Sequence, residues 1–533
     1  MYQPDELKSD EPLFWSPGRG VDVWAMFQAA MAGDVPALER LIASDAGLAR
    51  CHYEYHTPLM FAVRANQVEA ASYLFGLHPP TLGNPFEAAR DREYSEMAAM
   101  LDAKLAALGW SPAGDELAAA IRARDPDGVR ELLDASPELV HAADRSTNRP
   151  IHWAVMTRQL DLIDELLARG ADIDAQRYDG ARPIQLANGD YGYRGWRDVP
   201  ADVQITPRQV LEHLRAHGAY VDICTASYIG DLERVRELLA EDPSRANRPG
   251  AYVTYYACSG TPLRNAAAAG HMDVVRLLLE HGADPNLPEE HIAPRGHALY
   301  SAVFHDHREI ARLLLEHGAY PNVEVESSAD TLTIAHARGN REMIELLASC
   351  GAARKPHLLG YTGDVETAAA VFAANPALAD DPHALANAAR EGKEAYVRLV
   401  LRYAPELPKR LGPDAGGKTR AITELLFAHG MDPNRASWMG VTPLHHFAEY
   451  GDLENAALYI EHGADVGARD ANFRSTPLAW AARGGQKDMV ELLLARGARP
   501  NLPDDSAWAT PLAWATRRGR SDVVDLLRRQ GAT

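Results

Sequence analysis

Residues 412 to 419 read GPDAGGKT, a spacing of two glycines, a lysine and a threonine that is typical of a phosphate-binding loop. In such a loop, backbone N–H groups and the start of a helix surround the phosphates, and the lysine neutralises part of their charge. The loop works only when a strand leads into it and a helix leaves it. The chemistry to consider first is therefore nucleotide binding, with Lys418 as the central cation.

The segments around this motif favour a different interpretation. Upstream, EAYVRLVLRYAPEL has apolar side chains at helical spacing, and Pro405 and Pro408 then interrupt the chain. A nucleotide hydrolase also needs a strand that ends in a metal-binding aspartate, and the sequence contains no β-rich apolar run of that kind. We interpret 412–419 as a degenerate first helix of a repeat, with a flexible seam at 405–420. Phosphate-loop nucleotide binding by 412–419 remains the enzymatic alternative.

Other residue patterns offer little catalytic chemistry. Cys51, His52 and His56 in CHYEYH have a spacing that suits a metal, but a structural zinc site needs a fourth ligand and no second pair lies near. His445 follows a Thr-Pro-Leu sequence, where a buried hydrogen-bonding role is expected. The common hydrolase, metalloprotease and calcium-loop signatures do not occur. We predict no catalytic, cofactor-binding or metal-ligating residues, and hence no enzyme.

Composition narrows the class of partner. Of the 533 residues, 46% are hydrophobic, which indicates a folded chain. The net charge of -20 indicates that the chain repels nucleic acids and anionic membranes. A neutral or basic protein partner is favoured. The N-terminus has no secretory pattern, and no apolar run is long enough to span a membrane. The four cysteines are far apart, which indicates free thiols and predicts a cytoplasmic location.

The chain repeats itself at a period of 33 to 36 residues. Copies of Gly-Ala-Asp or a near match begin at residues 170, 218, 282, 318, 430, 463 and 497, and Thr-Pro-Leu begins at 57, 261, 442, 476 and 510. Thr476 can cap a helix start and Pro477 can occupy its first position, whereas Gly497 can supply a left-handed stop. Each period therefore predicts a helix, a turn, a second helix and a loop.

The stretch TPLRNAAAAGHMDVVRLLLEHGADPN at 261–286 resembles the ankyrin repeat almost throughout. Recognisable copies extend over nearly the whole chain, or roughly fifteen units at the ankyrin period. The fold that this resemblance implies is an all-α solenoid of stacked helix-turn-helix units with finger-like hairpin loops. We predict a leader at 1–22, repeats at 23–411 with an inserted loop at 189–209, and further repeats at 412–533 after the degenerate unit.

The resemblance also implies where a protein partner binds: on the residues before Thr-Pro-Leu and on the two residues before the glycine that ends the first helix. Carried over position by position, the partner-facing residues are Tyr53, Glu54, His56 and Arg64 in one unit, Arg145, Ser146, Asn148, Met156 and Thr157 in a second, and Trp438, Met439, Val441, Glu449 and Tyr450 in a third. For each of these, packing under a neighbouring finger is the alternative.

The interval between the copies at 170 and 218 exceeds a normal unit, which places an insertion in GDYGYRGWRDVPADVQITPRQ at 189–209. Long loops within compact repeats are uncommon and often functional. The further partner-binding candidates in this loop are Tyr191, Tyr193, Arg194, Trp196 and Arg197. The alternatives for this loop are packing on the next repeat and a plain tolerated insertion, and the tyrosines at 252, 255 and 256 have the same ambiguity. The leading hypothesis is a protein-binding scaffold, and a structural, self-assembling solenoid is the third possibility.

Overall fold

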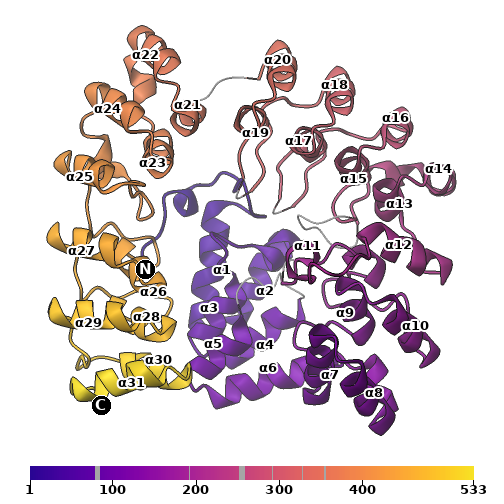
Figure 1. The fold of residues 1–533 in the computed structure, drawn as a ribbon, viewed down its shortest axis with the longest axis horizontal. Helices are drawn as coiled ribbons and strands as arrows, with labels where there is room; N and C mark the ends of the chain where they lie inside the picture. The colour runs from indigo at the N-terminus through magenta and orange to yellow at the C-terminus, as the bar shows by residue number, and fades with distance from the viewer. Residues whose placement is uncertain (78–83, 191, 251–257, 291, 327, 353–355) are drawn as a thin grey trace. The chain divides into compact units, whose positions relative to one another are not determined.

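A computed structural model describes residues 1–77, 84–190, 192–250, 258–290, 292–326, 328–352 and 356–533. Within these ranges the regular structure is α-helix and short 3-10 helix, with four isolated β-bridges and no strand. The helices follow one another in pairs joined by short turns (Figure 1). The prediction of an all-α fold is confirmed for the described residues.

Several first helices begin where the sequence supplies a capping side chain and a proline. Before α3 (Pro58–Arg64), the hydroxyl of Thr57 accepts the N–H of Met60 at 3.3 Å. Thr476 caps α28 (Pro477–Gly484) in the same way. Proline has no N–H, but at the first helical position an N–H would have no partner within the helix, so nothing is lost. The Thr-Pro-Leu sequences therefore mark helix starts, as predicted.

Second helices start and end through equally local causes. Asp452 accepts the N–H of Asn455 at 3.1 Å and so caps α27 (Leu453–Glu461). Beyond α29 (Lys487–Ala495), Gly497 has a φ of +91°. This left-handed conformation costs residues with a Cβ about 1–2 kcal/mol, so glycine ends the helix at little cost.

The described chain divides into two compact units. The amino unit comprises Asp10–Phe86 and Glu96–Ala352, and the carboxyl unit comprises Met1–Ser9, Glu87–Ser95 and Ala353–Thr533. The domain boundary predicted at residue 412 falls inside the carboxyl unit. The flexibility predicted for 405–420 stays a prediction.

In the amino unit, first helices of successive repeats pack on one another, as α13 does on α15 and α15 on α17. The insertion and the two repeats on either side of it share one buried apolar cluster that extends from Leu117 to Ala219. The elements of this unit are α1 (Gly20–Ala32), α2 (Val35–Ser44), η2 (Ala46–Arg50), α3, α4 (Val68–Gly76), α6 (Ser95–Ala107), α7 (Pro112–Ala123), α8 (Pro126–Ala135), η3 (Pro137–His141), α9 (Pro150–Met156), α10 (Leu160–Ala168), η4 (Pro183–Leu186), α11 (Gly195–Asp198), α12 (Pro207–Ala216), α13 (Ile223–Ile229), α14 (Leu232–Glu241), η5 (Pro243–Asn247), α15 (Pro262–Ala269), α16 (Met272–Glu280), α17 (His297–Phe304), α18 (Arg308–Glu316), α19 (Thr331–Ala337) and α20 (Arg341–Ser349).

In the carboxyl unit, α26 packs on α28 and α28 packs on α30, and Trp514 is fully buried between them. The elements of this unit are η1 (Glu6–Lys8), most of α5 (Pro85–Asp91), α21 (Pro356–Thr362), α22 (Val365–Ala374), η6 (Pro376–Ala379), α23 (Pro382–Arg390), α24 (Glu394–Tyr403), η7 (Leu407–Arg410), α25 (Arg420–Ala428), α26 (Pro443–Tyr450), α27, α28, α29, η8 (Ala507–Ala509), α30 (Pro511–Arg517) and α31 (Ser521–Arg529).

The GPDAGGKT segment has the degenerate structure predicted for it. Residues 411–419 contain no helix, and η7 and α24 precede them where a phosphate-binding loop needs a strand. The N–H of Lys418 donates to the carbonyl of Ala389 at 2.8 Å, and the N–H of Gly417 donates to the hydroxyl of Thr423 at 3.0 Å. Thr419 caps α25. Two N–H groups that a phosphate would use are therefore bonded within the fold.

Buried histidines connect consecutive repeats. The Nδ1 atom of His445 accepts the N–H of Thr442 at 3.1 Å, and its Nε2–H donates to the carbonyl of Ser475 in the next finger at 3.2 Å. The side chain is fully buried, and burial lowers the pKa of His445. The predicted hydrogen-bonding role of His445 is confirmed.

Candidate partner-binding surface

The inserted loop is folded onto the preceding repeat. The ring of Tyr193 packs edge-on against Trp153 of α9, with ring centroids 5.3 Å apart and an interplanar angle of 85°. Its N–H donates to Asp190 at 2.7 Å, and its hydroxyl donates to the carbonyl of Asp198 at 3.2 Å. Tyr193 is buried, and burial raises the pKa of this phenol. This residue anchors the insertion instead of facing solvent as predicted.

A buried arginine fixes the base of the same loop. The guanidinium of Arg177 pairs with Asp190 at the start of the insertion and with Asp179, and it donates to the side-chain oxygen of Asn148 at 3.1 Å. Burial alone would lower the pKa of Arg177, but the two carboxylates outweigh it and raise the pKa above its ordinary value. An arginine with two carboxylate partners in a dry site is held in one orientation. The insertion therefore leaves the repeat from a rigid base.

The tip of the insertion is exposed. Helix α11 presents Trp196 with 61% of its surface accessible, and the guanidinium of Arg197 lies 4.1 Å from the centre of its ring. The N–H of Arg194 donates to Asp198 at 2.7 Å and closes this short turn. Tryptophan and arginine are the residue types that most often dominate binding energy at protein interfaces. This pair has the chemistry expected of an interface anchor.

Arginines surround the base of this tip. The guanidinium of Arg122 lies 4.8 Å from the ring of Trp153 and 5.9 Å from the ring of Tyr193. Arg124 and Arg158 also act electrostatically on Tyr193. We name the exposed and half-buried residues Arg122, Arg194, Trp196 and Arg197 the insertion surface. Its charge is positive, although the chain as a whole is acidic.

The finger at 53–56 is a tight hairpin. Tyr53 and His56 exchange both backbone hydrogen bonds, at 3.0 and 2.9 Å, and Glu54 and Tyr55 between them adopt positive φ. Glu54 is exposed, whereas Tyr53 and His56 are half-buried. The hydroxyl of Tyr55 donates to Glu326 of a later finger in the amino unit. Part of this finger is therefore engaged within the chain itself.

The CHYEYH segment, which contains this finger, also serves the fold locally. Cys51 is fully buried, and burial raises the pKa of its thiol. The Nδ1–H of His56 donates to the carbonyl of Glu54 at 2.7 Å. Arg50, just before the segment, pairs with Glu290 at 3.1 Å. Farther along the same repeat, Arg64 at the end of α3 is half-buried.

The unit at 149 has both exposed and buried candidates. Arg145 and Ser146 are exposed at the finger, where the Arg145 guanidinium lies 4.6 Å from the ring of Trp110. The buried candidates are Asn148, Met156 and Thr157. The expectation that these three side chains face a partner is corrected, because the Asn148 side-chain oxygen accepts from Arg177, the Thr157 hydroxyl donates to the carbonyl of Trp153, and Met156 belongs to the buried apolar cluster.

The unit at 442 also departs from the prediction. Trp438, Met439 and Val441 are buried, with 3%, 2% and 5% of their surfaces exposed. Their finger packs beside the next one, where the N–H of Ala471 donates to the carbonyl of Met439 at 2.7 Å. The expectation of exposed anchors at these three positions is therefore corrected, and the alternative of packing under a neighbouring finger holds.

Two candidates of that unit do reach the surface. Tyr450, at the end of α26, has 76% of its surface exposed. Glu449 is half-buried and pairs with Arg483 of α28. Tyr191 and the tyrosines at 252, 255 and 256 lie outside the described residues.

Sequence reasoning missed a polar groove that crosses three successive repeats. It has a volume of about 740 Å³ and is lined at the starts of α16, α18 and α20, with Met272, His307, Arg308, Arg338 and Glu342 among its residues. Its side chains come from turns that carry no distinctive motif. The repeat period aligns these turns along the solenoid. Every repeat of the chain has the same period, so the period does not distinguish these three turns from the others.

The sequence comparisons agree with the repeated helix pairs. Residues 223–325, 414–504 and 462–533 match the family described as ankyrin repeats in three copies, and residues 148–178 match the single ankyrin repeat. The chain is an ankyrin repeat protein. The insertion lies between the end of the single-repeat match at residue 178 and the start of the first three-copy match at residue 223.

Several curated proteins are similar to part of this chain. A probable E3 ubiquitin-protein ligase of Oryza sativa subsp. japonica is 28% identical over 197 residues, or 33% of this chain and 39% of that protein. The human transient receptor potential cation channel subfamily A member 1 is 23% identical over 165 residues, or 30% of this chain and 14% of the channel. The ankyrin repeat protein nuc-2 of Neurospora crassa is 26% identical over 175 residues, or 32% of this chain and 15% of that protein.

The matches span no more than 39% of these three relatives. The chain thus matches well under half the length of each of these relatives. Within the described residues, none of the helices combines the length and the apolar character needed to cross a lipid bilayer.

Proposed function

We propose that this ankyrin repeat protein is a non-enzymatic scaffold that binds another protein, with the insertion surface as its main contact. The observation that carries the proposal is an exposed Trp196–Arg197 pair on a loop whose base is fixed by buried groups. A rigid base matters because a contact residue that is already ordered loses little entropy on binding. The relatives named above have unlike activities, which supports a binding role and favours no particular reaction.

The charge of the chain suggests the chemistry of the partner. A net charge of -20 favours a partner that is neutral or basic overall, because it steers such a partner during approach. At the insertion surface the arginines favour a local carboxylate or a carbonyl edge that Arg197 can contact. We therefore propose a neutral or basic protein that presents an acidic or aromatic side chain to this surface. Nucleic acids and membranes are not proposed as partners, and the cytoplasm is the proposed location.

Other predicted residues offer further contacts within their own units where their side chains are accessible. The candidates that retain exposed or half-buried side chains outside the insertion are Tyr53, Glu54, His56, Arg64, Arg145, Ser146, Glu449 and Tyr450. We propose that they contribute less than Trp196 and Arg197, since charged and polar rim residues usually change binding energy little.

Affinity capture with matched variants tests the proposal. Trp196→Ala removes an exposed ring, and Tyr220→Ala is its control because Tyr220 is also exposed and stacks with an arginine at 5.1 Å. Arg197→Glu reverses a charge on the insertion, and Arg236→Glu does so at an exposed site on α14. We expect the first variant of each pair to lower capture of the partner about 30-fold, which corresponds to about 2 kcal/mol. Equal capture by all four variants would refute the insertion surface as the contact.

The two alternatives have their own measurements. For nucleotide binding, the melting temperature is measured with millimolar ATP and magnesium, and a rise that disappears in Lys418→Ala would support it. For self-assembly, light scattering is recorded over a range of concentrations, and a rising mass would support a structural role. We expect neither signal.

A further inference from the structure

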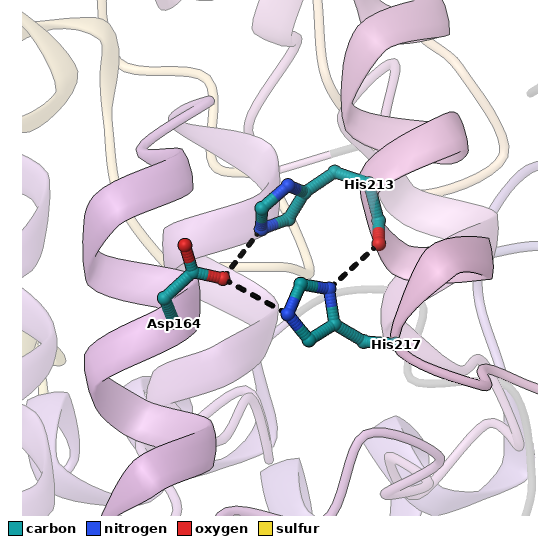
Figure 2. A group of neighbouring side chains, drawn as sticks. All are labelled: Asp164, His213 and His217. Atoms are coloured by element: carbon teal, nitrogen blue, oxygen red, sulfur yellow. Dashed lines mark hydrogen bonds and ion pairs between the residues drawn. The ribbon is translucent and has the colours of Figure 1, made fainter.

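Three side chains meet between the second helices of two consecutive repeats. Asp164 projects from α10, and His213 and His217 project from the last turn of α12 (Figure 2). The two histidines are four residues apart, so they lie on the same face of the helix. No metal ligands were predicted from the sequence, in which 49 residues separate Asp164 from His213.

The spacing of the ligand atoms suits a small cation. The Nε2 atoms of His213 and His217 lie 2.6 and 3.3 Å from the same carboxylate oxygen of Asp164, and all three ligand atoms lie within 4.8 Å of one another. Zinc bonds of about 2.0–2.1 Å in a tetrahedral arrangement place ligand atoms about 3.4 Å apart. The His213 nitrogen, at 2.6 Å from the carboxylate oxygen, would have to move outward to reach that spacing.

The hydrogen bonding of His217 favours a cation at its outer nitrogen. Its Nδ1 atom lies 2.9 Å from the carbonyl oxygen of His213, and since a carbonyl only accepts, Nδ1 must carry the hydrogen (Figure 2). In the neutral imidazole the lone pair is then on Nε2, which faces the carboxylate of Asp164. A metal ion held between the Nε2 atom of His217 and the carboxylate of Asp164 would bond to both. Histidine ligands usually donate their second N–H to a carbonyl in this way.

The cluster is not a by-product of the repeat pattern. His317 occupies the same position after α18, and its Nδ1–H donates to the carbonyl four residues earlier at 2.8 Å. In that repeat, however, Leu313 stands where His213 stands, and Arg276 of the preceding repeat stands where Asp164 stands. The orienting hydrogen bond is thus common to both repeats, whereas the ligands occur only at α10 and α12.

We propose that Asp164, His213 and His217 bind one divalent transition-metal ion of the zinc class. Two imidazoles and one carboxylate suit zinc, copper or nickel better than calcium or magnesium. The three side chains are 50%, 20% and 39% exposed, so the fourth position of the ion opens to solvent. The ion would join α10 of one repeat to α12 of the next, and so hold together the repeat that contains the insertion and the repeat before it.

Metal titration of the full chain tests this proposal. Chelator-treated protein is titrated with Zn²⁺ by calorimetry and with Co²⁺ by visible absorption, which reports on imidazole ligation. We expect one Zn²⁺ ion at this site in the wild type. His213→Leu introduces the residue that stands at this position, as Leu313, in the repeat of α18. Loss of an outer-shell partner weakens metal binding roughly 10- to 100-fold. We expect His213→Leu and Asp164→Asn each to weaken Zn²⁺ binding by more than this.

His317→Ala is the control, because it removes the same carbonyl bond from a repeat without the ligands. We expect it to bind Zn²⁺ as the wild type does, and circular dichroism checks that each variant is folded. Unchanged Zn²⁺ binding in folded His213→Leu and Asp164→Asn would overturn the proposal and leave the cluster as an ion pair. Equal loss of binding in His317→Ala would overturn it too, because the effect would then not be specific to the cluster.

Discussion

A buried histidine makes the stability of the amino unit depend on pH. His152 is fully buried, its Nδ1 accepts the N–H of Arg149 at 3.0 Å, and its Nε2–H donates to the carbonyl of Ala175 at 3.0 Å. Burial lowers the pKa of His152 to about 3. A protonated ring would lose the bond to Arg149 and bury a charge. Folding therefore requires the neutral imidazole.

The sign and size of the effect follow from linkage. The unfolded chain binds a proton at a pKa of about 6.5, whereas the folded chain does not do so until about 3. The stability that His152 contributes is thus fully present above pH 6.5 and is lost as the pH falls from 6.5 toward 3. Each pH unit in that window costs about 1.4 kcal/mol, so the loss at pH 4.5 is about 2.7 kcal/mol.

The chain supplies its own non-titrating replacement. In the next repeat Gln185 occupies the position of His152, and its side-chain oxygen accepts the N–H of Arg182 at 2.9 Å. His152→Gln should therefore keep the cap and abolish the proton linkage. The difference is measured by urea unfolding of both proteins at pH 7.5 and 4.5. Amide hydrogen exchange in α9 and α10 is used as the readout, because solenoids can unfold in sections.

We expect the wild type to lose about 2.7 kcal/mol more between these two pH values than His152→Gln does. Parallel losses in the two proteins would refute the reasoning, since His152 would then not be the group that titrates. The reasoning would also be refuted if His152→Gln unfolded more easily at both pH values but kept the pH dependence of the wild type.

Three further predictions concern packing and charge. Tyr193→Ala removes a buried ring, so it should destabilise the amino unit by about 3 kcal/mol and expose the insertion to proteolysis. Tyr193→Phe removes only the hydroxyl and should cost about 1 kcal/mol. Urea unfolding and limited digestion measure the two effects. Burial raises the pKa of Glu289, but pairing with His297 outweighs burial and holds the pKa at about 2. The stability that Glu289 contributes is therefore present above pH 4.5 and is lost as the pH falls toward 2. Glu289→Gln should flatten the pH dependence of unfolding in that window, and an unchanged acid transition would contradict the assignment. Gly360→Ala should lower the melting temperature strongly, because a Cβ there overlaps a backbone carbonyl of α23, whereas Gly76→Ala, which meets open space, should not.

Much of the fold was predictable because its causes are local. Thr57 and Thr476 cap helices through atoms three residues away, and Gly497 ends a helix through its own φ. The same reasoning assigned GPDAGGKT correctly, because a phosphate-binding loop needs a strand and the segment upstream has helical spacing. Repetition then extended each local assignment to the next unit.

The candidate site was less predictable. Trp438 and Trp196 have the same chemistry and both lie in connecting segments, yet one is buried and the other is exposed. The difference depends on whether a neighbouring finger covers the ring. The sequence around each ring does not contain that information, because the covering residues belong to another repeat.

By itself, the sequence determined the period, the helix starts and stops, the apolar faces and the place of the insertion. Each of these depends on interactions within about one repeat. Only the tertiary structure decided which finger residues are covered, that Tyr193 anchors the insertion while Trp196 remains exposed, and that Asp164 meets His213 and His217. Those outcomes depend on the stacking of one repeat on the next, which sets distances between residues that are far apart along the chain.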